Sequence, residues 1–323
     1  MKILVAGGAG YIGSRLVPVL LEHGYEVEVI DLLWFGNHLP SDIKVIQKDL
    51  FCCKEEDLRG YAQVIFLAGI SNDPMAEYNP AKNFIGNGAL PSYVAYMAKK
   101  AGVKRFIYAS SCSVYGYSVD RLYDEDAPAI SNYPYGISKL QGERGVLQLQ
   151  NNSFSVIALR QGTVCGHSPR MRFDLIVNAM FKTAVTQQRI VVSNPAIWRP
   201  ILDIRDATAA YLRAIEAPSQ ISGVFNIASD NYTVSQTADL VKIEVERVLG
   251  KKITIEIHNH NDMRNYKVLL SKAKTYLGFA PIYSIGQIVD ELFEHIEEYG
   301  NLEQDQYYNI RIFKKIDDGS LLY

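Results

Sequence analysis

The chain has 323 residues, of which 48% are hydrophobic and 21% charged, a composition typical of a soluble globular protein with one large or two small domains. A formal net charge of −2 excludes the basic excess of nucleic-acid-binding proteins, and no apolar run reaches the roughly 18 residues of a membrane span. The four cysteines, Cys52, Cys53, Cys112 and Cys165, show no CxxC or Cys/His ligand spacing. We therefore expect a reducing cytoplasmic location and no structural metal, nucleic-acid partner or membrane partner.

The first half of the chain alternates short β-branched runs with longer amphipathic runs. Strands are predicted at Lys2–Ala6, Glu26–Ile30, Ile43–Gln47, Gln63–Leu67, Arg105–Ser110 and Phe154–Leu159. Helices are predicted at Tyr11–His23, Asn87–Ala101 and Tyr135–Leu149. Nearly all-apolar strands that alternate with helices indicate a parallel sheet covered on both faces. This is a doubly wound α/β fold, whose ligands bind at the carboxyl ends of the strands.

After Thr163 the loops lengthen, and Pro and Arg become frequent. The predicted elements there are a helix at Phe173–Gln187 and two strand–helix pairs, Pro200–Ile204 with Asp206–Ile215 and Gly223–Ala228 with Val234–Leu249. We predict a cofactor domain from residues 1–163 and 200–230, and a smaller, discontinuous C-terminal substrate domain from residues 164–199 and 231–323. The last stretch, Asn301 to Tyr323, has mixed charge and no clear period, so we expect a tail packed on the surface.

Three glycines, Gly7, Gly10 and Gly13, follow the first predicted strand and open the first helix. One permits a tight turn, one lets the backbone approach a pyrophosphate, and the third lets helix and strand pack closely. The free N–H groups at the helix start then face the phosphates. Such a triplet is weak evidence alone, because a glycine-rich turn can lack a ligand. Its place inside a strand–helix–strand unit predicts a dinucleotide site.

Asp31 ends the second strand, 18 residues after Gly13. A carboxylate there can accept hydrogen bonds from the adenosine ribose and would repel the extra phosphate of NADP. No Lys or Arg occurs between Asp31 and Ile43 to receive that phosphate, so the sequence favours NAD over NADP. The alternative for Asp31 itself is a solvated residue at the end of a strand, which the preceding glycine motif makes less favoured. Asp49 and Leu50 follow the third strand, where an adenine would lie.

Tyr135 and Lys139 place a phenol and an ammonium one helical turn apart on one face. The nearby cation should favour the phenolate and lower the pKa of the tyrosine from its reference value of about 10. Such a tyrosine can take a proton from a sugar hydroxyl while the sugar carbon gives hydride to a nicotinamide.

The same Tyr-x-x-x-Lys spacing recurs twice, so position must distinguish the pairs. The other two pairs are Tyr78/Lys82 and Tyr96/Lys100. Only Tyr135 begins the helix that follows the fifth strand, and we interpret the other two pairs as solvated helix faces. A hydroxyl at the end of that strand can hold the substrate oxygen beside the tyrosine. We predict Ser111 for this role and Ser113 as a substrate contact.

Together these features resemble the extended short-chain dehydrogenases/reductases, the NAD-dependent nucleotide-sugar epimerases and dehydratases, over nearly the whole chain. The likeness is carried by Gly7–Gly13, Asp31, Leu67-Ala68-Gly69, Asn87, Ser110-Ser111, Tyr135/Lys139, Arg160 to Gly166, and Trp198-Arg199-Pro200 ahead of Asp206. The set is specific, whereas any one motif would not be. The resemblance implies a Rossmann fold, NAD as cofactor and a nucleotide-diphosphate sugar as substrate. It also implies a homodimer packed through the helices that contain Asn87–Ala101 and Tyr135–Leu149.

The resemblance implies roles for individual residues. Ser111, Tyr135 and Lys139 would form the catalytic set, with Lys139 also holding the nicotinamide ribose. The implied cofactor site comprises Gly7, Gly10, Tyr11, Ile12, Gly13, Asp31, Asp49, Leu50, Leu67, Ala68, Gly69 and Asn87, the last near the active site and holding backbone in place. Thr163, Asn178, Arg199 and Arg264 would surround the diphosphate, because a diphosphate needs fixed cations and arginine offers a bidentate fork. For Arg264 a surface ion pair is the alternative.

Departures from the family narrow the reaction. Dehydratases acting at C4 and C6 resemble one another in an Asp-Glu pair after the catalytic Ser or Thr, where this chain has Cys112 and Ser113. Without that acid and base we expect neither dehydration nor the decarboxylation that uses a Glu there. Double epimerases that act at C3 and C5 carry a cysteine at the Ser113 position. Because Cys112 is one residue away from it and would point elsewhere, we interpret Cys112 as a small buried residue. What remains is redox at C4, by a 4-epimerase, a 4-dehydrogenase or a 4-ketoreductase.

The stretch Gly162–Asp174 is similar to a subgroup that includes bacterial GDP-heptose 4-dehydrogenases of surface-polysaccharide pathways. Within it, Arg170 and Arg172 would bind phosphate or sugar hydroxyls, or brace the loop. The atypical segment Leu67–Pro74 lies where the sugar should sit. A hypothesis from another class, a non-catalytic NAD-binding regulator, is disfavoured because such proteins usually lose the tyrosine or lysine.

The His-Asn-His run at His258 and His260 has no evident third ligand. We expect both to be exposed strand residues without a metal.

Overall fold

The structure is a computed structural model that describes residues 1–258 and 264–321. Within these residues the chain forms a seven-stranded sheet in the order β11-β7-β5-β4-β1-β2-β3, with every neighbouring pair parallel. Its strands are β1 (Lys2–Ala6), β2 (Glu26–Asp31), β3 (Lys44–Gln47), β4 (Gln63–Phe66), β5 (Arg105–Ser111), β7 (Ser155–Gln161) and β11 (Gly223–Ile227). The strand order reverses beside β1, which opens a crevice at the carboxyl ends. The predicted doubly wound α/β sheet is confirmed.

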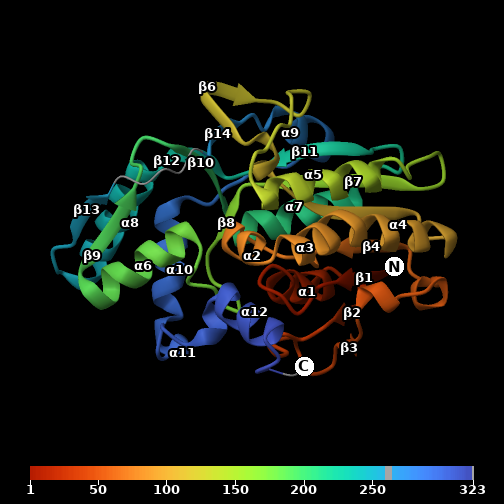
Figure 1. The fold of residues 1–323 in the computed structure, drawn as a ribbon, viewed down its shortest axis with the longest axis horizontal. Helices are drawn as coiled ribbons and strands as arrows, with labels where there is room; N and C mark the ends of the chain where they lie inside the picture. The colour runs from red at the N-terminus through yellow and green to blue at the C-terminus, as the bar shows by residue number, and fades with distance from the viewer. Residues whose placement is uncertain (259–263, 322–323) are drawn as a thin grey trace.

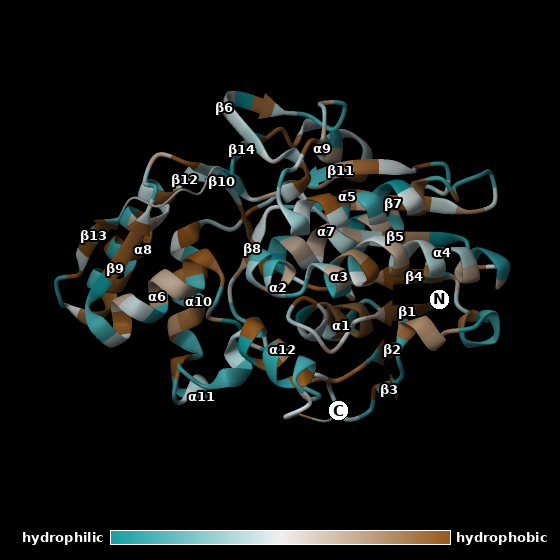
Figure 2. Cartoon of the chain, viewed as in Figure 1, coloured by the Kyte–Doolittle hydropathy of each residue, from teal (hydrophilic) through white to brown (hydrophobic). Residues whose placement is uncertain are grey.

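Helices cover both faces of this sheet (Figure 1). They include α1 (Gly13–Glu22), α4 (Leu90–Lys100), α5 (Pro134–Leu147) and α7 (Ile204–Glu216). Alternate residues of β1 enter different cores: Ile3 and Val5 pack with α1 and α7, whereas Leu4 and Ala6 pack with α4 and α5. Because side chains alternate along a strand, a central strand must be apolar throughout, as the brown central strands of Figure 2 show.

The second half of the chain adds smaller sheets beside the first. One has the order β12-β10-β8, and two pairs are β13-β9 and β14-β6. The strands are β6 (Tyr117–Tyr123), β8 (Thr163–Cys165), β9 (Arg189–Ser193), β10 (Trp198–Asp203), β12 (Asp230–Thr233), β13 (Thr254–His258) and β14 (Asn265–Val268). Of the segment 200–230, β11 joins the large sheet but β10 pairs with β8 and β12. The division into two domains stays a prediction.

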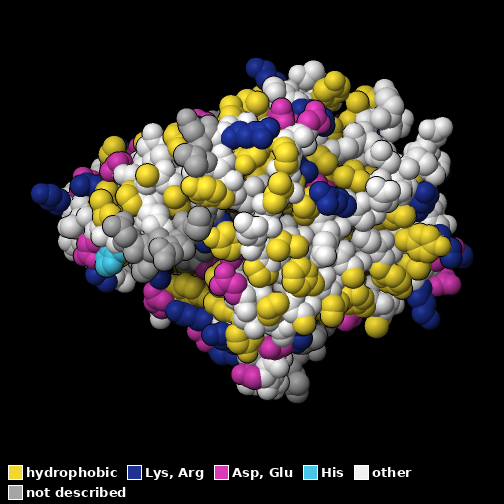
Figure 3. Space-filling view, turned by 45° about the horizontal axis from the view of Figure 1, so that its top comes forward, with side chains coloured by type: hydrophobic (Ala, Val, Ile, Leu, Met, Phe, Trp, Pro, Cys, Tyr) yellow, Lys and Arg dark blue, Asp and Glu magenta, His cyan; other side chains and the backbone are white. Residues whose placement is uncertain are grey.

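The described residues form further helical elements besides the four named above. They are η1 (Leu50–Cys52), η2 (Glu55–Leu58), α2 (Asp73–Tyr78), α3 (Pro80–Asn83), the π-helix η3 (Phe84–Ala89), η4 (Cys112–Tyr115), α6 (Ile176–Gln187), α8 (Val234–Leu249), α9 (Ser271–Leu277), α10 (Ile285–Glu294), α11 (Ile296–Tyr299), η5 (Asp305–Tyr307) and α12 (Asn309–Asp317). None of the described helices is both long and apolar enough to cross a bilayer. On the face in Figure 3, Lys/Arg and Asp/Glu side chains are interspersed with hydrophobic ones.

The expectation of a surface tail after Asn301 is wrong. This stretch contains α12, which contacts α2 and buries Asn309 and Phe313. Phe313 is fully buried beside Ile70 and Met75, with Trp34 packed against the same cluster. The apolar residues Ile312, Phe313 and Ile316 follow helical spacing, so this sequence contains a helical pattern that the prediction overlooked.

Helix α5 is positioned by polar contacts rather than by an apolar stripe. Its buried residues are Gly136, Ser138, Lys139, Gly142, Glu143 and Val146. Glu143 and Arg160 of β7 form a bidentate ion pair, with Nη2 to Oε1 at 2.6 Å and Nε to Oε2 at 2.9 Å. Ser110 of β5 donates to the same carboxylate at 2.6 Å. Because the two charged side chains are only 2% and 6% exposed, this contact fixes α5 against β5 and β7.

Removing one partner of this pair should unfold the protein more easily. We expect Glu143→Ala to lower the free energy of unfolding by about 3–5 kcal/mol, because Arg160 is then a buried, unpaired charge. Chemical denaturation measures the change. Replacing both partners with Met should cost less than the single substitution. As a control, Glu216→Ala breaks an exposed pair with Arg213 and should change stability by about 1 kcal/mol or less. A Glu143→Ala variant as stable as the control would contradict this account.

Candidate active site

A cavity of about 940 Å³ lies at the carboxyl ends of the large sheet and extends to residues from the second half of the chain. Nearly all the predicted site residues line it: Gly7, Gly10, Tyr11, Ile12, Gly13, Asp31, Asp49, Leu50, Leu67, Ala68, Gly69, Ser111, Ser113, Tyr135, Lys139, Thr163, Arg170, Arg172, Arg199 and Arg264. Two predicted site residues, Asn87 and Asn178, do not line the cavity that the described residues form. Residues from both halves of the chain therefore meet in one space.

The glycine loop has the backbone that a dinucleotide needs. Gly7 has a φ of +80°, and a Cβ there would lie 2.4 Å from the Ala68 nitrogen. A Cβ on Gly13 would lie 2.2 Å from the Gly8 oxygen, so the start of α1 packs directly on the loop. A Cβ on Gly10 would approach only the Gly7 oxygen, at 3.4 Å, among the atoms considered. This cradle fits a pyrophosphate at a helix N-terminus.

Asp31 is fixed at the end of β2 by the backbone. Its Oδ2 accepts from the Ala9 nitrogen at 2.9 Å and its Oδ1 from the Leu33 nitrogen at 2.8 Å. Burial raises the pKa of Asp31 above its ordinary value, and these hydrogen bonds partly offset the rise. A carboxylate has further lone pairs, so this group still fits the ribose hydroxyls of NAD.

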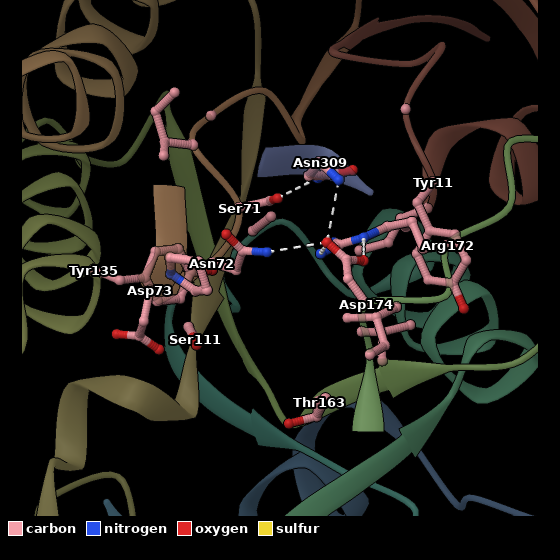
Figure 4. Close-up of a pocket in the computed structure, with 18 of the residues that line it drawn as sticks. Tyr11, Ser71, Asn72, Asp73, Ser111, Tyr135, Thr163, Arg172, Asp174 and Asn309 are labelled. Atoms are coloured by element: carbon pink, nitrogen blue, oxygen red, sulfur yellow. Dashed lines mark hydrogen bonds and ion pairs between the residues drawn. The ribbon is translucent and has the colours of Figure 1, made fainter. Parts of the chain in front are cut away.

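Ser111, Tyr135 and Lys139 all line the cavity. Figure 4 shows Ser111 and Tyr135 on the same side of it. Ser111 ends β5, where its Oγ accepts from the Ser113 nitrogen at 3.1 Å and lies 2.8 Å from the Ser113 Oγ. Tyr135 lies in the first turn of α5, whose extended N-cap residue and early proline start the helix there. The Lys139 ammonium lies 4.6 Å from the centre of the Tyr108 ring.

The expectation that Lys139 lowers the pKa of Tyr135 is wrong for the ligand-free protein. Burial raises the pKa of Tyr135, the charge of Asp73 raises it further, and the Ser111 hydroxyl lowers it. Burial also lowers the pKa of Lys139 to about 7. A low-dielectric site disfavours both the phenolate and the ammonium, so sequence spacing alone does not establish the charged pair.

Asn87 acts on the backbone and does not line the cavity. Its Oδ1 accepts from the Ile70 nitrogen at 2.9 Å, and its Nδ2 donates to the Ile70 oxygen at 2.8 Å. The same amide donates to Ser138 of α5 at 3.2 Å. Asn87 thus clamps the loop after β4 to α5, which is the backbone-holding role that the resemblance implies for it. A direct contact of Asn87 with the cofactor stays a prediction.

Asn178 is buried behind the cavity and is not one of its lining residues. Its side chain is fully buried, accepts from the Gly166 nitrogen at 3.0 Å, and donates to the Arg172 oxygen at 2.8 Å and the Tyr11 hydroxyl at 3.2 Å. Both amide hydrogens of Asn178 therefore have protein partners. Asn178 holds the 166–172 loop against the glycine loop, and its contact with a substrate stays a prediction.

The folded cavity contains a carboxylate that local sequence reasoning missed. Asp73, at the start of α2, lies beside Tyr135 and Ser111 in Figure 4 and forms an ion pair with Arg264. The only signal was the atypical segment Leu67–Pro74. Cys112 is buried, as expected. Although positions 112 and 113 carry no carboxylate, Asp73 brings one into the cavity from another segment.

The other predicted cations have protein partners. Arg172 forms a bidentate pair with Asp174, at 2.7 and 3.1 Å. Arg199 donates to the Trp198 oxygen at 2.9 Å and to the Arg264 oxygen. A bound diphosphate would have to compete with or join these contacts.

Two groups of histidines bear on metal binding. His258 is exposed in β13, and His260 lies outside the described residues. His167, His295 and Glu298 have potential ligand atoms within 4.8 Å of one another. However, the two rings stack with centroids 3.6 Å apart and planes at 6°. Parallel rings cannot both direct in-plane lone pairs at one ion, so this arrangement does not form a metal site.

Replacing Asp31 tests the cofactor half of the cavity. We expect Asp31→Ala to weaken NAD binding by about 10- to 100-fold, because charged hydrogen bonds to the ribose are lost. Discrimination against NADP should also decrease. Calorimetric titration measures both, with the exposed Asp42→Ala variant as control. Unchanged NAD affinity in a folded Asp31→Ala protein would refute the assignment.

Comparison with known proteins identifies the family of the chain. Residues 3–228 match the model of the NAD dependent epimerase/dehydratase family. The UDP-glucose 4-epimerase of Corynebacterium glutamicum is 26% identical, covering 93% of this chain and 97% of that protein. The UDP-glucose 4-epimerase of Bacillus subtilis is 32% identical over 53% of this chain and 55% of its own.

Solved structures share the fold. That of Thermotoga maritima UDP-glucose 4-epimerase with UDP-glucose has a TM-score of 0.82 and 25% identity, and covers 93% of this chain and all of that one. That of Bacillus cereus UDP-glucuronic acid 4-epimerase with UDP-glucuronic acid and NAD has a TM-score of 0.81 and 24% identity, with coverages of 92% and 99%. Because the family match spans most of the chain, this protein belongs to the NAD-dependent epimerase/dehydratase family of enzymes.

Proposed function

We propose that this protein interconverts the C4 epimers of a nucleoside-diphosphate sugar, with NAD held in the glycine-loop half of the cavity. The observation that carries the proposal is the single cavity shared by Ser111, Tyr135 and the glycine loop. Its volume of about 940 Å³ lies at the upper end of the range for small-molecule sites, as a site for a cofactor and a substrate requires. The 4-epimerase activity of the relatives supports C4 as the reacting carbon.

The residues of the trio have separate tasks in this proposal. Ser111 holds the C4 hydroxyl beside Tyr135, and the Tyr135 oxygen takes its proton. Lys139 binds the nicotinamide ribose and, once charged, favours the phenolate. NAD, when bound, supplies the hydride acceptor for C4. Return of hydride to the other face of the sugar gives the epimer.

The substrate half is proposed to hold the diphosphate with Thr163, Arg199 and Arg264, and the sugar beside Ser113 and Arg172. All five line the cavity. Arg264 would exchange its ion pair with Asp73 for the diphosphate, whose charge is greater. Such an exchange would leave the Asp73 carboxylate facing the sugar.

The setting of the reaction is also a proposal. The likeness of Gly162–Asp174 to enzymes of surface-polysaccharide pathways supports a role in that biosynthesis. The four thiols are unpaired, as expected in a reducing cytoplasm. The family resemblance supports a homodimer packed through η3, α4 and α5, where Tyr96 of α4 is exposed.

A second candidate is a net 4-dehydrogenase or 4-ketoreductase, which the Gly162–Asp174 likeness favours. Incubation with UDP-, GDP-, dTDP- and CDP-sugars, followed by chromatography and mass spectrometry, separates the two. The epimerase yields an isomer of unchanged mass and no net NADH. A product lighter by two hydrogens, formed with stoichiometric NADH, would replace the epimerase proposal with the dehydrogenase.

Replacing the proposed base tests the trio. Tyr135→Phe should lower turnover by at least about 100-fold, because proton transfer from the C4 hydroxyl is lost, and should leave NAD affinity nearly unchanged. Tyr96→Phe is the matched control, since Tyr96 precedes Lys100 with the same spacing but is exposed on α4. Turnover is followed by the epimer ratio. A Tyr135→Phe enzyme as active as the control would refute the catalytic assignment.

The charge of Asp73 should appear in the pH dependence. Asp73 raises the pKa of Tyr135, so removing its charge lowers that pKa. Oxidation requires the deprotonated tyrosine, so its rate rises as pH passes through this pKa. We therefore expect the rising limb for Asp73→Asn to move to lower pH by about one unit. The exposed Asp290→Asn variant is the control. A limb that stays in place or moves to higher pH would contradict the assigned interaction.

A further inference from the structure

Arg170 is a buried cation without an anionic partner. It is 2% exposed, and it forms no ion pair with any residue in the described part of the chain. Its Nη2 donates to the Asn309 Oδ1, but Nε and Nη1 have no hydrogen-bond partner among the described residues. The guanidinium carbon lies 3.7 Å from the centre of the Phe35 ring. Burying an uncompensated charge is costly, so this arrangement indicates an anion that binds from outside the chain.

The surroundings of Arg170 place it at the cofactor end of the cavity. Phe35 follows β2, and Asp31 at the end of that strand is near enough to act electrostatically on the guanidinium without pairing with it. Two positions later, Arg172 already has a carboxylate in Asp174. The Asp174 carboxylate also acts electrostatically on Arg170, but among the described residues it forms a salt bridge with Arg172 only. Arg170 therefore shares the field of this carboxylate and has no paired counterion of its own.

Other cations around the cofactor end are already paired. Arg15, one turn into α1, forms an ion pair with Glu291 at 2.7 Å. Lys48, which lines the cavity near Asp49, pairs with Asp57 at 2.6 Å. The loop from Gly7 to Ser14 itself contains no Lys or Arg. The glycine loop therefore offers neutral N–H groups and a helix dipole, and Arg170 is the group that can add a full positive charge.

The position of Arg170 is set in advance by contacts across the chain. Asn309 of α12 donates from Nδ2 to the Ser71 Oγ at 2.5 Å, and its backbone nitrogen donates to Asp174 at 3.2 Å (Figure 4). Ser168, two residues before Arg170, donates to the Tyr11 oxygen at 2.7 Å. These bonds hold the arginine against the glycine loop before any ligand arrives, which reduces the entropy cost of binding.

We propose that Arg170 binds the pyrophosphate of the dinucleotide from the C-terminal half of the chain, opposite the glycine loop, with Asn309 as its positioning residue. A guanidinium fork matches two phosphate oxygens, and the Nε and Nη1 donors of Arg170 are not used by any described residue. This inference rests on NAD as the cofactor and is independent of the sugar reaction. It moves Arg170 from the substrate side, where the sequence placed it, to the cofactor side.

The test measures binding to nucleotide-stripped protein, without a sugar. NAD, ADP-ribose, adenosine and NADP are titrated into wild type and Arg170→Gln by calorimetry or ligand-observed NMR. Arg170→Gln should weaken NAD and ADP-ribose by about 10- to 100-fold, the range for a charged hydrogen bond, and should leave adenosine unchanged. Arg189→Gln, which removes an exposed partner of Glu256, is the control for loss of charge.

A second readout separates ligand binding from a structural role. Because Arg170→Gln removes a buried, unpaired charge, the ligand-free variant should melt at or above the wild-type temperature, while its stabilisation by NAD should be smaller. A structural arginine would instead lower the melting temperature of the ligand-free protein. If the glutamine variant does not fold, Arg170→Met, which keeps an apolar chain over Phe35, is measured in the same way.

Three results would overturn the proposal. Unchanged ADP-ribose affinity in a folded variant would show that Arg170 does not bind the pyrophosphate. An equal loss for adenosine would show that it shapes the adenosine site instead. A loss confined to NADP would assign it to a ribose phosphate. Because no sugar enters these titrations, each result leaves the epimerase proposal to its own test.

Discussion

The buried pair of Glu143 and Arg160 is the contact on which the rest of the active site depends. Helix α5 carries Tyr135 and Lys139, yet its buried face is composed largely of glycine, serine and charged side chains. Hydrophobic burial therefore does little to fix the rotation of α5 about its own axis. The bidentate pair, joined by Ser110, fixes α5 on the strands that carry Ser111 and lead to Thr163. The geometry of the trio thus follows from one polar contact inside the core.

Burial makes the protonation of Tyr135 and Lys139 dependent on nearby charges. Burial disfavours the phenolate of Tyr135 and the ammonium of Lys139 alike, and Asp73 adds a negative charge beside the tyrosine. A cation near the phenol would reverse this balance. Since Arg264 is an ion-pair partner of Asp73, a change in the surroundings of Arg264 also changes the charge that acts on the tyrosine. The protein supplies the geometry, and bound charges set the protonation.

Local patterns predicted what local physics determines. Strand β1 and helix α8 occur at their predicted bounds, and the glycine loop and trio lie in the cavity, because each depends on residues close in sequence or on strand order. Contacts between distant segments were not predictable. The positions of Asp73 and Asn178, and the burial of Asn309, arise where loops from separate halves of the chain meet. The spacing of residues in the sequence does not contain that information.

Asn309 shows how the two halves of the site communicate. Its side chain contacts Arg170 and Ser71, the latter in the loop that leads to Asp73, while its backbone binds Asp174, the partner of Arg172. One residue of α12 thus joins the two arginine positions to the loop after β4. That loop is held twice, at Ile70 by Asn87 and at Ser71 by Asn309, just before Asp73 enters the cavity. The position of Asp73 beside Tyr135 therefore depends on residues from both halves of the chain.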